Sequence, residues 1–593
     1  MNNNELEVEP SVDAAKTKSR FETQLELLAN GRWYLVVLVY LFFSALYLLT
    51  WVGNVGDTDD VYYFAYLVEN FPVNYVGDPR LLLYKAAMQW GYLGINLAEL
   101  PITGLQLMRA FSALCGGAIV IVFYQMLVRD LKIHVIAAAA ATMFLVMSYG
   151  FWRYAIEAEV YIPSILLLLI ALRWFYHLEN KVEVGPFAMV PLGVFSGIVV
   201  LFYQPNAIPL ALAFTLMMLR RGRCCGLIVY GLVAGVIVIG GYWLGFKIYT
   251  THPLGLETFQ QFLAQRSLEF VVWPFDKENI IRATLGSILI LTHDLVSANW
   301  LFAHDWVALD VKQLFAYEWF VEKQYTARQG GWLIYPPLLL LPLLGLLSLW
   351  LIIRAFPYGF KALVQQKTLP YLVWLLFSGL VVWRLNPYGP EAWIMLLPPL
   401  VVVLTILVIQ PAVMNGVRKP LLAMVLIVVA HNAMSGIGII HDHLSEYAVA
   451  KTQWILDNAG ENDAVLIVDD NPLFMTMNYR SNAVILPLVL EATPIIAEGL
   501  LSGKWRVKLA SELSKDFRVV MLDEFFAKTL REGNRVIFTS DFFEGSRRRQ
   551  YSTMSDKELA LLDELRSRLT EVWHDDELGS IYVMDKPLSP VRR

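Results

Sequence analysis

The sequence predicts a multi-span α-helical membrane protein that ends in a small extracytoplasmic α/β domain. Of its 593 residues, 57% are hydrophobic and only 17% are charged, and the mean hydropathy is +0.51. A single soluble globular domain would not have this composition. Long apolar runs recur up to Ile440, whereas short β-rich runs alternate with helical stretches from His441 onward. The change in pattern places a domain boundary near residue 440.

Charge and cysteine content exclude few classes of protein. The net charge of −5 does not indicate nucleic acid, because the charged residues are confined to loops and to the tail. The 3 cysteines do not form a disulfide framework, since Cys115 lies inside an apolar run and Cys224 and Cys225 are adjacent. The polar, mixed-charge N-terminal tail (residues 1–32) does not have the pattern of a cleavable signal peptide.

About eleven apolar runs are long enough, or nearly so, to cross a bilayer as helices. The first, Trp33–Val52, carries no charged residue, and we expect it to be a retained membrane anchor. The others are Ala110–Val128, Val135–Phe151, Tyr161–Tyr176, Phe187–Phe202, Ala207–Leu219, Gly226–Phe246, Trp332–Ile353, Leu369–Val382, Ala392–Ile409 and Leu421–Ile440.

Basic residues assign a direction to these runs. They fall in alternate loops, all on one side of the membrane, at Lys16, Lys18, Arg20, Arg32, Arg129, Lys132, Lys181, Arg220, Arg221, Arg223, Arg354, Lys361, Lys367, Arg418 and Lys419. Because cytoplasmic loops carry an excess of Lys and Arg, we expect the N-terminus inside and the C-terminus outside. Residues 33–440 would then form the membrane domain, with long outward loops at 53–109 and 247–331.

Two outward segments have further structure of their own. Ile280–Leu291 in the second long loop is too short and interrupted to span, and we expect an interfacial or re-entrant helix there. The tail (residues 441–593) reads as an α/β domain. Its expected strands are Ala464–Val468, Ala483–Leu486, Arg518–Leu522, Val536–Thr539 and Ile581–Met584.

Ionisable and aromatic residues collect at the outward ends of the predicted spans. Asp57, Asp59 and Asp60 follow the first span within a few residues. The remaining candidates are Arg80 and Lys85 in the first loop, Arg153, Glu157, Glu159 and Tyr161 in the hairpin after the third span, and Arg384, Tyr388 and Glu391 in the third outward loop. Charges this close to hydrocarbon cost a few kcal/mol each unless they are paired or solvated, so they indicate a functional site.

Several of these residues also have an ordinary structural interpretation. Arg153 and Glu157 are spaced as an i, i+4 ion pair, and Asp57 or its neighbour could cap the next helix. Arg80 and Lys85 could extend to the membrane interface. Glu159 fits such a role less well, because it cannot share the helix face of Arg153 and Glu157.

One reaction suits carboxylates at the outer membrane surface. A lipid phosphate-linked sugar presents its anomeric carbon at the depth of the headgroups. An Asp can take the proton from an attacking hydroxyl, while Arg or Lys can bind the departing phosphate through charge-assisted hydrogen bonds. Aromatic side chains can face the sugar. A nucleotide is not needed, which agrees with the lack of a glycine-rich phosphate loop in the tail domain.

The motifs that carry these residues resemble the GT-C superfamily of polytopic glycosyltransferases, which includes the protein O-mannosyltransferases and the lipid A aminoarabinose transferase. Asp59-Asp60 stands where that superfamily places an acidic pair, and Phe151 to Tyr161 resembles its Trp, Ala, Glu, Tyr signature. Pro79 to Tyr84 is similar to its Pro-x-His-Leu-Leu-Tyr segment, although Leu81 or Leu82 replaces the His. Asn386 to Trp393 resembles a late-span element.

The resemblance implies an inverting transfer from a polyprenyl-phosphate sugar to a glycan, lipid or protein acceptor. Asp59 would be the general base, with Asp57 and Asp60 in support. Some superfamily members bind a divalent metal such as Mg²⁺ or Mn²⁺ through these acids and others do not, so the metal stays open. The alternatives are a glycan ligase acting on a lipid pyrophosphate, and a transporter or lipid flippase. Because the sequence contains no Asn-x-Ser/Thr sequon, we favour the bacterial inner membrane over the endoplasmic reticulum.

Overall fold

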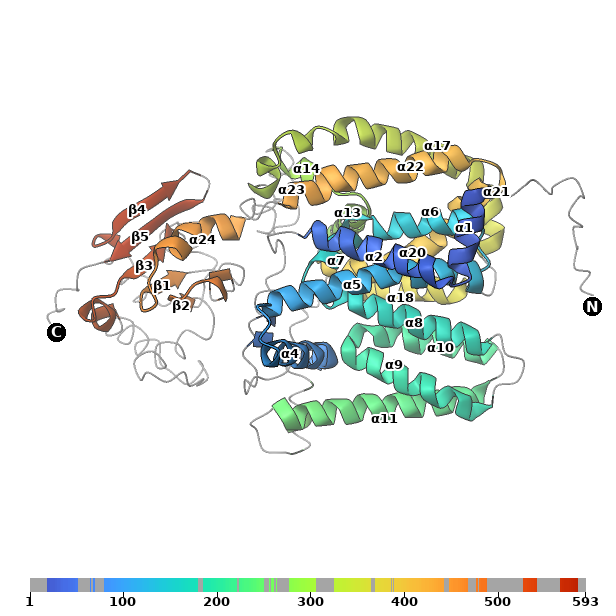
Figure 1. Ribbon diagram of the computed structural model, residues 1–593, viewed down its shortest axis with the longest axis horizontal. Coiled ribbons are helices and arrows are strands. Elements are labelled where there is room, and N and C mark those ends of the chain that lie inside the picture. The colour runs from blue at the N-terminus through green and yellow to red at the C-terminus, as the bar shows by residue number, and fades with distance from the viewer. Residues whose placement is uncertain are drawn as a thin grey trace, which may run out of the picture.

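The computed structural model contains a bundle of helices and, beyond one end of it, a sheet (Figure 1). The residues that it describes are 19–51, 64–65, 68–69, 79–179, 185–220, 223–249, 255, 258–260, 263, 277–304, 325–363, 368–385, 387, 389–441, 447–467, 476–477, 479–487, 526–540, 566–576 and 578–584.

Helices form the chain up to the sheet, with short 3-10 or π-helical segments labelled η. The first half contains α1 (Arg20–Ala29), α2 (Trp33–Leu49), η2 (Pro79–Leu81), α4 (Leu82–Leu97), α5 (Gly104–Gln125), η3 (Met126–Asp130), α6 (Val135–Val146), α7 (Tyr149–Ile156), α8 (Tyr161–Glu179), η4 (Pro186–Met189), α9 (Val190–Phe202), η5 (Gln204–Asn206), α10 (Ala207–Arg220) and α11 (Cys224–Tyr249). The second half contains α13 (Lys277–Leu295), α14 (Asn299–Phe302), η6 (Gly331–Ile334), α17 (Pro337–Leu363), α18 (Leu369–Leu385), α19 (Pro390–Trp393), η7 (Ile394–Leu396), α20 (Leu397–Leu404), η8 (Thr405–Ile409), α21 (Gln410–Met414), α22 (Arg418–His431), η9 (Asn432–Ile437), α23 (Gly438–Ile440) and α24 (Tyr447–Asn458).

Each predicted apolar run coincides with a helix or with helices joined end to end. Within the described residues, 6 helices are long and apolar enough to cross a membrane, or up to 8 if each bent pair counts as one span. Two shorter apolar helices, Pro186–Phe202 and Leu369–Leu385, add to these. The chain therefore has the predicted multi-span helical architecture, while the predicted number of spans is not confirmed.

One predicted span is bent. The run Val135–Phe151 falls on two helices, since α6 ends at Val146 and α7 starts at Tyr149, with a bend of 60° between them. The backbone of Ser148 is extended (φ −61°, ψ 146°), so the helix cannot continue through it. The bend redirects α7, which carries Arg153.

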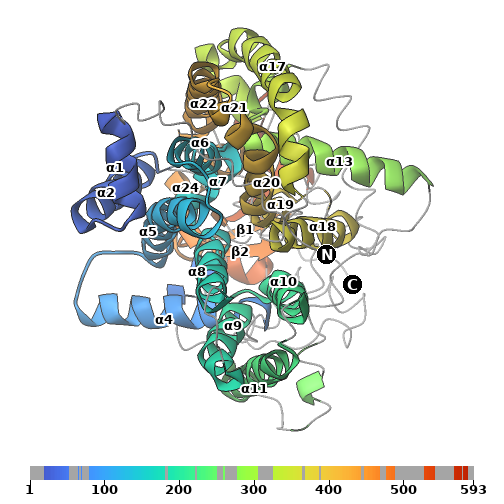
Figure 2. The ribbon, with the colours of Figure 1, turned by 90° about the vertical axis from the view of Figure 1, so that its right-hand side faces the viewer.

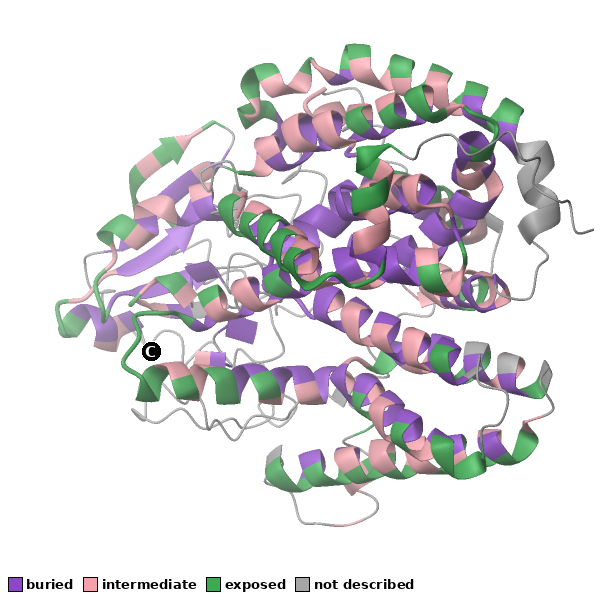
Figure 3. Ribbon diagram, turned by 45° about the vertical axis from the view of Figure 1, so that its right-hand side comes forward, coloured by how far each residue is buried: buried purple, intermediate pink, exposed green. Residues whose placement is uncertain are grey.

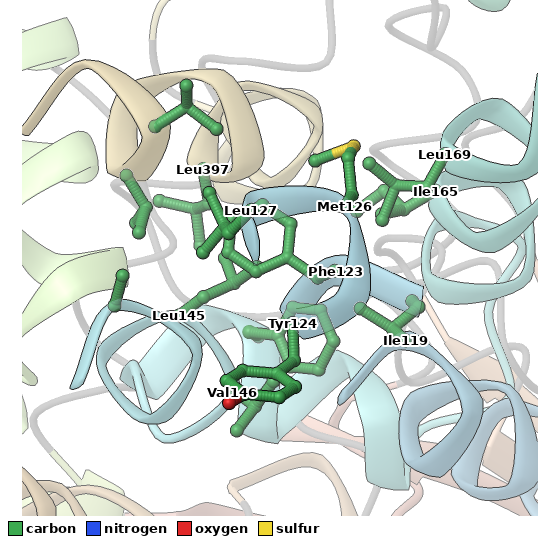
Figure 4. Close-up of a cluster of buried hydrophobic side chains, with 14 of the residues drawn as sticks. Ile119, Phe123, Tyr124, Met126, Leu127, Leu145, Val146, Ile165, Leu169 and Leu397 are labelled. Atoms are coloured by element: carbon green, nitrogen blue, oxygen red, sulfur yellow. The ribbon is translucent and has the colours of Figure 1, made fainter. Parts of the chain in front are cut away.

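The central helices pack through one large apolar core. Ile119 and Phe123 of α5, Leu145 of α6, Leu169 of α8 and Leu397 of α20 meet in it (Figure 4). Since lipid tails are as apolar as these side chains, close van der Waals packing rather than transfer out of water stabilises the core. The outer helices α11 and α17 expose much of their apolar surface, as lipid-facing helices do (Figure 3).

Two of the basic residues predicted to lie on the cytoplasmic side, Arg129 and Arg418, lie at the end of the bundle that holds α1. Arg418 binds Glu22 of α1 at 2.8 Å, and the Arg129 guanidinium lies 3.7 Å from the point where a side chain on Gly31 would begin. The sheet lies beyond the opposite end of the bundle (Figure 1). α1 and the sheet therefore lie at opposite ends of the bundle (Figure 1).

Two helices lie across the bundle rather than along it. In the view along the bundle, α4 and α13 are seen lengthwise, whereas α5 and α8 are seen nearly end-on (Figure 2). α13 contains the segment Ile280–Leu291, and it is not one of the described helices that are long and apolar enough to span a membrane. α4 and α13 belong to the two long loops that were predicted to face outward.

The C-terminal sheet is mixed and has the strand order β2-β1-β3-β5-β4. β1 pairs in parallel with β2 and β3, and β5 pairs antiparallel with β3 and β4. The strands are β1 (Ala464–Ile467), β2 (Val484–Pro487), β3 (Val536–Thr539), β4 (Thr570–Asp575) and β5 (Gly579–Met584). Ile455 of α24 packs on the sheet against Val465 and Ile485, giving the small α/β unit that the tail predicted.

Four of the five expected strand segments form β1, β2, β3 and β5. Arg518–Leu522 lies outside the described residues. The sequence did not predict β4, because Thr-Glu-Val-Trp-His-Asp is mostly polar. An edge strand with one exposed face tolerates such residues, and β4 is largely exposed.

An ion pair between Asp463 and Arg535 joins the starts of β1 and β3, with an N–O distance of 2.6 Å. Burial alone would raise the pKa of Asp463, but hydrogen bonds from the Arg535 side chain and from the backbone N–H of Gly460 outweigh it and lower that pKa. A lowered folded-state pKa stabilises the domain above the ordinary value of 3.8. This stabilisation is lost as the pH falls through the folded-state value.

We therefore expect amide hydrogen exchange in β1 and β3, after correction for the intrinsic rate, to be faster near pH 3 than near pH 6. In Asp463→Asn, which carries no charge at this position, protection should be weaker at pH 6 and should change less between the two values. An equal pH dependence in both proteins would contradict the role of Asp463.

Candidate active site

The structure describes eight of the predicted site residues. Four others, Asp57, Asp59, Asp60 and Tyr388, lie outside the described residues. Four of the described side chains are almost completely buried: Lys85, Arg153, Glu157 and Glu159. The other four are half-buried: Arg80, Tyr161, Arg384 and Glu391. Buried charges in an apolar bundle are stable only with partners, so their contacts define the site.

Arg153 and Glu157 form an ion pair at the end of α7. Arg153 Nε donates to Glu157 Oε1 at 2.8 Å, and the side chains are 2% and 1% exposed. Exposed pairs at this spacing contribute little, but here both charges are withdrawn from solvent. The guanidinium also lies 5.4 Å from the centre of the Tyr154 ring. The pair therefore belongs to the interior of the bundle and is not a solvent-exposed helix cap.

Charges from three elements surround the side chain of Tyr154. Those close enough to act on it electrostatically are Arg153, Glu157, Asp294 and Glu391. Asp294, at the end of α13, packs directly on α7, because a Cβ on Gly150 would lie 2.8 Å from its Oδ1. Helices α7, α13 and α19 thus bring three carboxylates and one guanidinium into a single region.

Glu159 faces a second group of elements. The backbone of Glu157 is extended (φ −102°, ψ 161°), so the chain has left α7 before it reaches Glu159. Ser112 Oγ of α5 donates to the Glu159 carbonyl at 3.0 Å. The Glu159 charge acts on the Tyr84 hydroxyl of α4, and Tyr84 precedes Lys85. The hairpin between α7 and α8 therefore meets both α4 and α5.

An apolar cluster places the basic residues beside this hairpin. Tyr84, Met108, Ala158 and Val160 pack together, with Leu81 and Phe64 in the same cluster. The charged neighbours of these residues in sequence, Arg80, Lys85, Arg109 and Glu159, therefore border one region. Lys85 and Arg109 are each 5% exposed. Three basic residues from η2, α4 and α5 and one glutamate from the hairpin are thus the sequence neighbours of a single apolar cluster.

The first outward loop starts at this region as well. Arg109 lies over the ring of Trp51, 5.4 Å from its centre, and Trp152 Nε1 donates to Thr50 Oγ1 at 2.9 Å. Trp51 and Phe64 are the described residues on either side of Asp57, Asp59 and Asp60. Both belong to this end of the bundle.

Tyr161, the first residue of α8, lies between two other tyrosines. Its ring makes edge-to-face contacts with Tyr154 at 5.4 Å and with Tyr203 at 5.6 Å between centroids. The three rings connect the carboxylates around Tyr154 with the end of α9. Aromatic side chains of this kind can pack against the apolar faces of a sugar.

Sequence reasoning missed three residues of this region: Arg109, Tyr154 and Asp294. Arg109 and Asp294 each adjoin an apolar run, and the rule that ionisable residues beside such runs are functional candidates would have found both. Their meeting depends on tertiary packing. Among the described residues, no group of three or more His, Cys, Asp or Glu side chains is placed to hold a metal ion.

A contact joins the sheet domain to the first outward loop. Tyr479 donates its hydroxyl to Glu69 Oε1 at 2.6 Å, and the same oxygen accepts the backbone N–H of Gly104 at 2.7 Å. Gly104 is the first residue of α5, so the carboxylate lies at a helix N-terminus, where negative charge is stabilised. Burial, followed by the hydrogen bond to Glu69, raises the pKa of Tyr479, and the hydroxyl therefore stays protonated.

Tyr479→Phe is expected to loosen this contact, because a hydrogen bond to a charged group contributes about 1.5–3 kcal/mol. Proteolytic cleavage between α23 and β1 should become faster, while the bundle keeps its thermal stability. The exposed Tyr335 provides the control, and Tyr335→Phe should leave cleavage unchanged. Equal cleavage rates in the Tyr479→Phe and wild-type proteins would show that the bond does not hold the domain.

No protein-family model matches the sequence, and no curated protein matches it either. Among solved structures, the chain is similar to ArnT from Cupriavidus metallidurans bound to undecaprenyl phosphate, with a TM-score of 0.50 and 12% identity over 94% of this chain and 98% of that one. The apo state of the same protein matches with a TM-score of 0.46, at 13% identity over 95% and 100% of the two chains. An Archaeoglobus fulgidus oligosaccharyltransferase matches with a TM-score of 0.42, at 12% identity over 94% and 73%. The similarity to ArnT confirms the GT-C fold that the sequence motifs predicted.

Proposed function

We propose that the protein is a membrane glycosyltransferase that moves a sugar from a polyprenyl-phosphate donor to an acceptor on the extracytoplasmic face. Its fold is that of GT-C glycosyltransferases, and the ArnT structure holds undecaprenyl phosphate. Fold alone does not define an activity. The proposal therefore depends on what the buried charges of this chain can do.

The observation that carries the proposal is the burial of opposite charges at one end of an apolar bundle. Lys85, Arg109 and Arg153 are at most 5% exposed, as are Glu159 and Asp294. A charge buried among apolar helices costs a few kcal/mol unless it is paired or lies in a polar cavity. Packing alone gives no reason to collect charges from α4, α5, α7 and α13 in one place.

The basic side of the site suits a lipid phosphate. Arg80, Lys85 and Arg109 border the apolar cluster around Tyr84. Their charge-assisted hydrogen bonds would hold the phosphate and stabilise the negative charge that grows on it as the bond to the sugar breaks. Arg384, in the last turn of α18, and Tyr388 would add to the binding of the donor.

The acidic side suits the sugar and the acceptor. Glu157, Glu159 and Glu391 would hold hydroxyl groups, and Tyr161 would pack against the sugar ring. Asp59 would take the proton from the acceptor hydroxyl as its oxygen attacks the anomeric carbon. Attack opposite to the departing phosphate inverts the configuration at that carbon. Asp57 and Asp60 would position the acceptor.

The positions of two basic residues support a site that faces outward, and we propose the bacterial inner membrane as its location. Arg129 and Arg418 lie with α1 at one end of the bundle, and the positive-inside rule makes that end cytoplasmic. Helices α4, α7 and α13, which carry or lead to the charged residues, lie toward the other end, as does the sheet (Figure 1). A donor flipped across the membrane would meet the acceptor there.

The proposed function is tested with purified protein and a radiolabelled sugar on polyprenyl phosphate. Transfer of the single sugar to an envelope glycan, lipid or protein fraction is expected, and mass analysis of the product identifies it. Transfer of a whole glycan from a lipid pyrophosphate would instead indicate the ligase. Movement of labelled lipid across liposomes without any product would indicate a flippase and overturn the proposal.

A further inference from the structure

A fully buried asparagine of the last apolar run lies against the ends of α6 and α13. Asn432 is 0% exposed and starts the π-helical turn η9. Its Nδ2 donates to the Met147 carbonyl at 2.9 Å and to the Leu295 carbonyl at 3.0 Å, and its Oδ1 accepts the Ser297 backbone N–H at 3.0 Å. One side chain thus satisfies three backbone groups of two other segments.

These backbone groups belong to the ends of α6 and α13. Met147 follows α6 at its bend toward α7, and α7 carries Arg153 and leads to Glu157. Leu295 is the last residue of α13 and adjoins Asp294. The carboxamide therefore ties together the two helix ends that bring Arg153 and Asp294 to Tyr154.

Neighbouring contacts hold the same junction. His431 Nε2 bonds the Ser297 carbonyl at 2.8 Å, and Asn299 Nδ2 donates to the Tyr149 hydroxyl at 3.1 Å. Gly436 leaves no room for a side chain, because a Cβ there would lie 2.6 Å from the Tyr149 ring. π-helical turns inside α-helices occur frequently at functional sites, and this one brings η9 against the first turn of α7.

We propose that Asn432 is a positioning residue for the transfer reaction, holding the ends of α6 and α13 so that Arg153, Glu157 and Asp294 face the reacting sugar. The inference rests on the proposed function. It separates two steps of the reaction, because the described bonds of Asn432 do not involve α4, which carries Lys85. Phosphate binding should then depend little on Asn432, whereas the chemical step should depend on it.

The first test compares Asn432→Ala with Gln410→Ala. Gln410 Oε1 accepts the His134 backbone N–H at 3.0 Å and so holds the other end of the same helix, α6. Asn432→Ala is expected to lower kcat by about 10- to 100-fold, the size of effect that a small misplacement of reacting groups produces. Its KM for the lipid donor should stay within about twofold, and Gln410→Ala should keep both constants.

Tyr149→Phe provides a milder variant that keeps the ring and removes the hydroxyl bound by Asn299. It should lower kcat several-fold with an unchanged KM, and it remains informative if Asn432→Ala does not fold. An unchanged kcat in Asn432→Ala, or equal losses in Asn432→Ala and Gln410→Ala, would overturn the proposal.

Amide hydrogen exchange measures how firmly the ends of α6 and α13 are held, and it does not require an active enzyme. Asn432→Ala should speed exchange in residues 147–157 and 293–299, and Gln410→Ala only around residues 134–138. Unchanged exchange at both of the first two segments would overturn the proposal even if the enzyme is active. If wild-type protein transfers no sugar, the proposed function fails, and the exchange data still decide whether Asn432 holds the two helix ends.

Discussion

Replacing Asp59 by Asn is expected to lower the rate of sugar transfer by about 10²- to 10⁴-fold, the contribution typical of a general base. The amide has the size of the carboxylate but cannot accept the proton of the attacking hydroxyl. Because Asp59 acts in the chemical step, kcat should fall while the KM for the polyprenyl-phosphate donor changes little. Steady-state transfer of labelled sugar by purified protein measures both constants.

The neighbouring acids are the matched controls for this prediction. Asp57→Asn and Asp60→Asn should each lower the rate of sugar transfer less than Asp59→Asn does, because these residues are proposed to position the acceptor rather than to take its proton. An unchanged melting temperature in all three variants would exclude misfolding as the cause. Full activity of Asp59→Asn together with loss in Asp60→Asn would transfer the role of base to Asp60.

The positions of the helices could be predicted from apolar runs, because a segment in lipid must satisfy its own backbone hydrogen bonds. The presence of an apolar run does not predict where its helix bends. Val135–Phe151 is apolar apart from Thr142 and Ser148, yet it breaks at Ser148, and the carbonyl of Met147 accepts a hydrogen bond from Asn432 of a distant helix. Such a partner cannot be read from the run itself.

The candidate site could be predicted only in part for the same reason. Arg153 and Glu157 are four residues apart, so their pairing follows from helix geometry. Asp294 reaches Gly150 because α13 lies across the bundle. The sequence predicted an interfacial or re-entrant helix over Ile280–Leu291, but not that the end of this helix would pack against Gly150. The pairing of Arg153 with Glu157 could therefore be predicted, while the contact between Asp294 and Gly150 could not.

Arg153→Met is expected to destabilise the protein by about 3–5 kcal/mol, the cost of removing one partner of a buried ion pair. The Glu157 carboxylate, 1% exposed and 2.8 Å from Arg153 Nε, would lose its guanidinium partner in an apolar surrounding. Glu157→Gln should cost less, since an amide oxygen still accepts from Arg153. Reversible unfolding in detergent micelles, followed by tryptophan fluorescence, measures these differences.

The double variant Arg153→Met/Glu157→Leu separates stability from function. Replacing a whole buried pair by apolar residues of similar volume is often neutral or stabilising, so stability should recover most of what Arg153→Met loses. Sugar transfer should not recover, because the pair is proposed to act on the substrate near Tyr154. Recovery of both would make the pair a structural element only. Recovery of stability without recovery of sugar transfer would show that the Arg153–Glu157 pair takes part in the reaction.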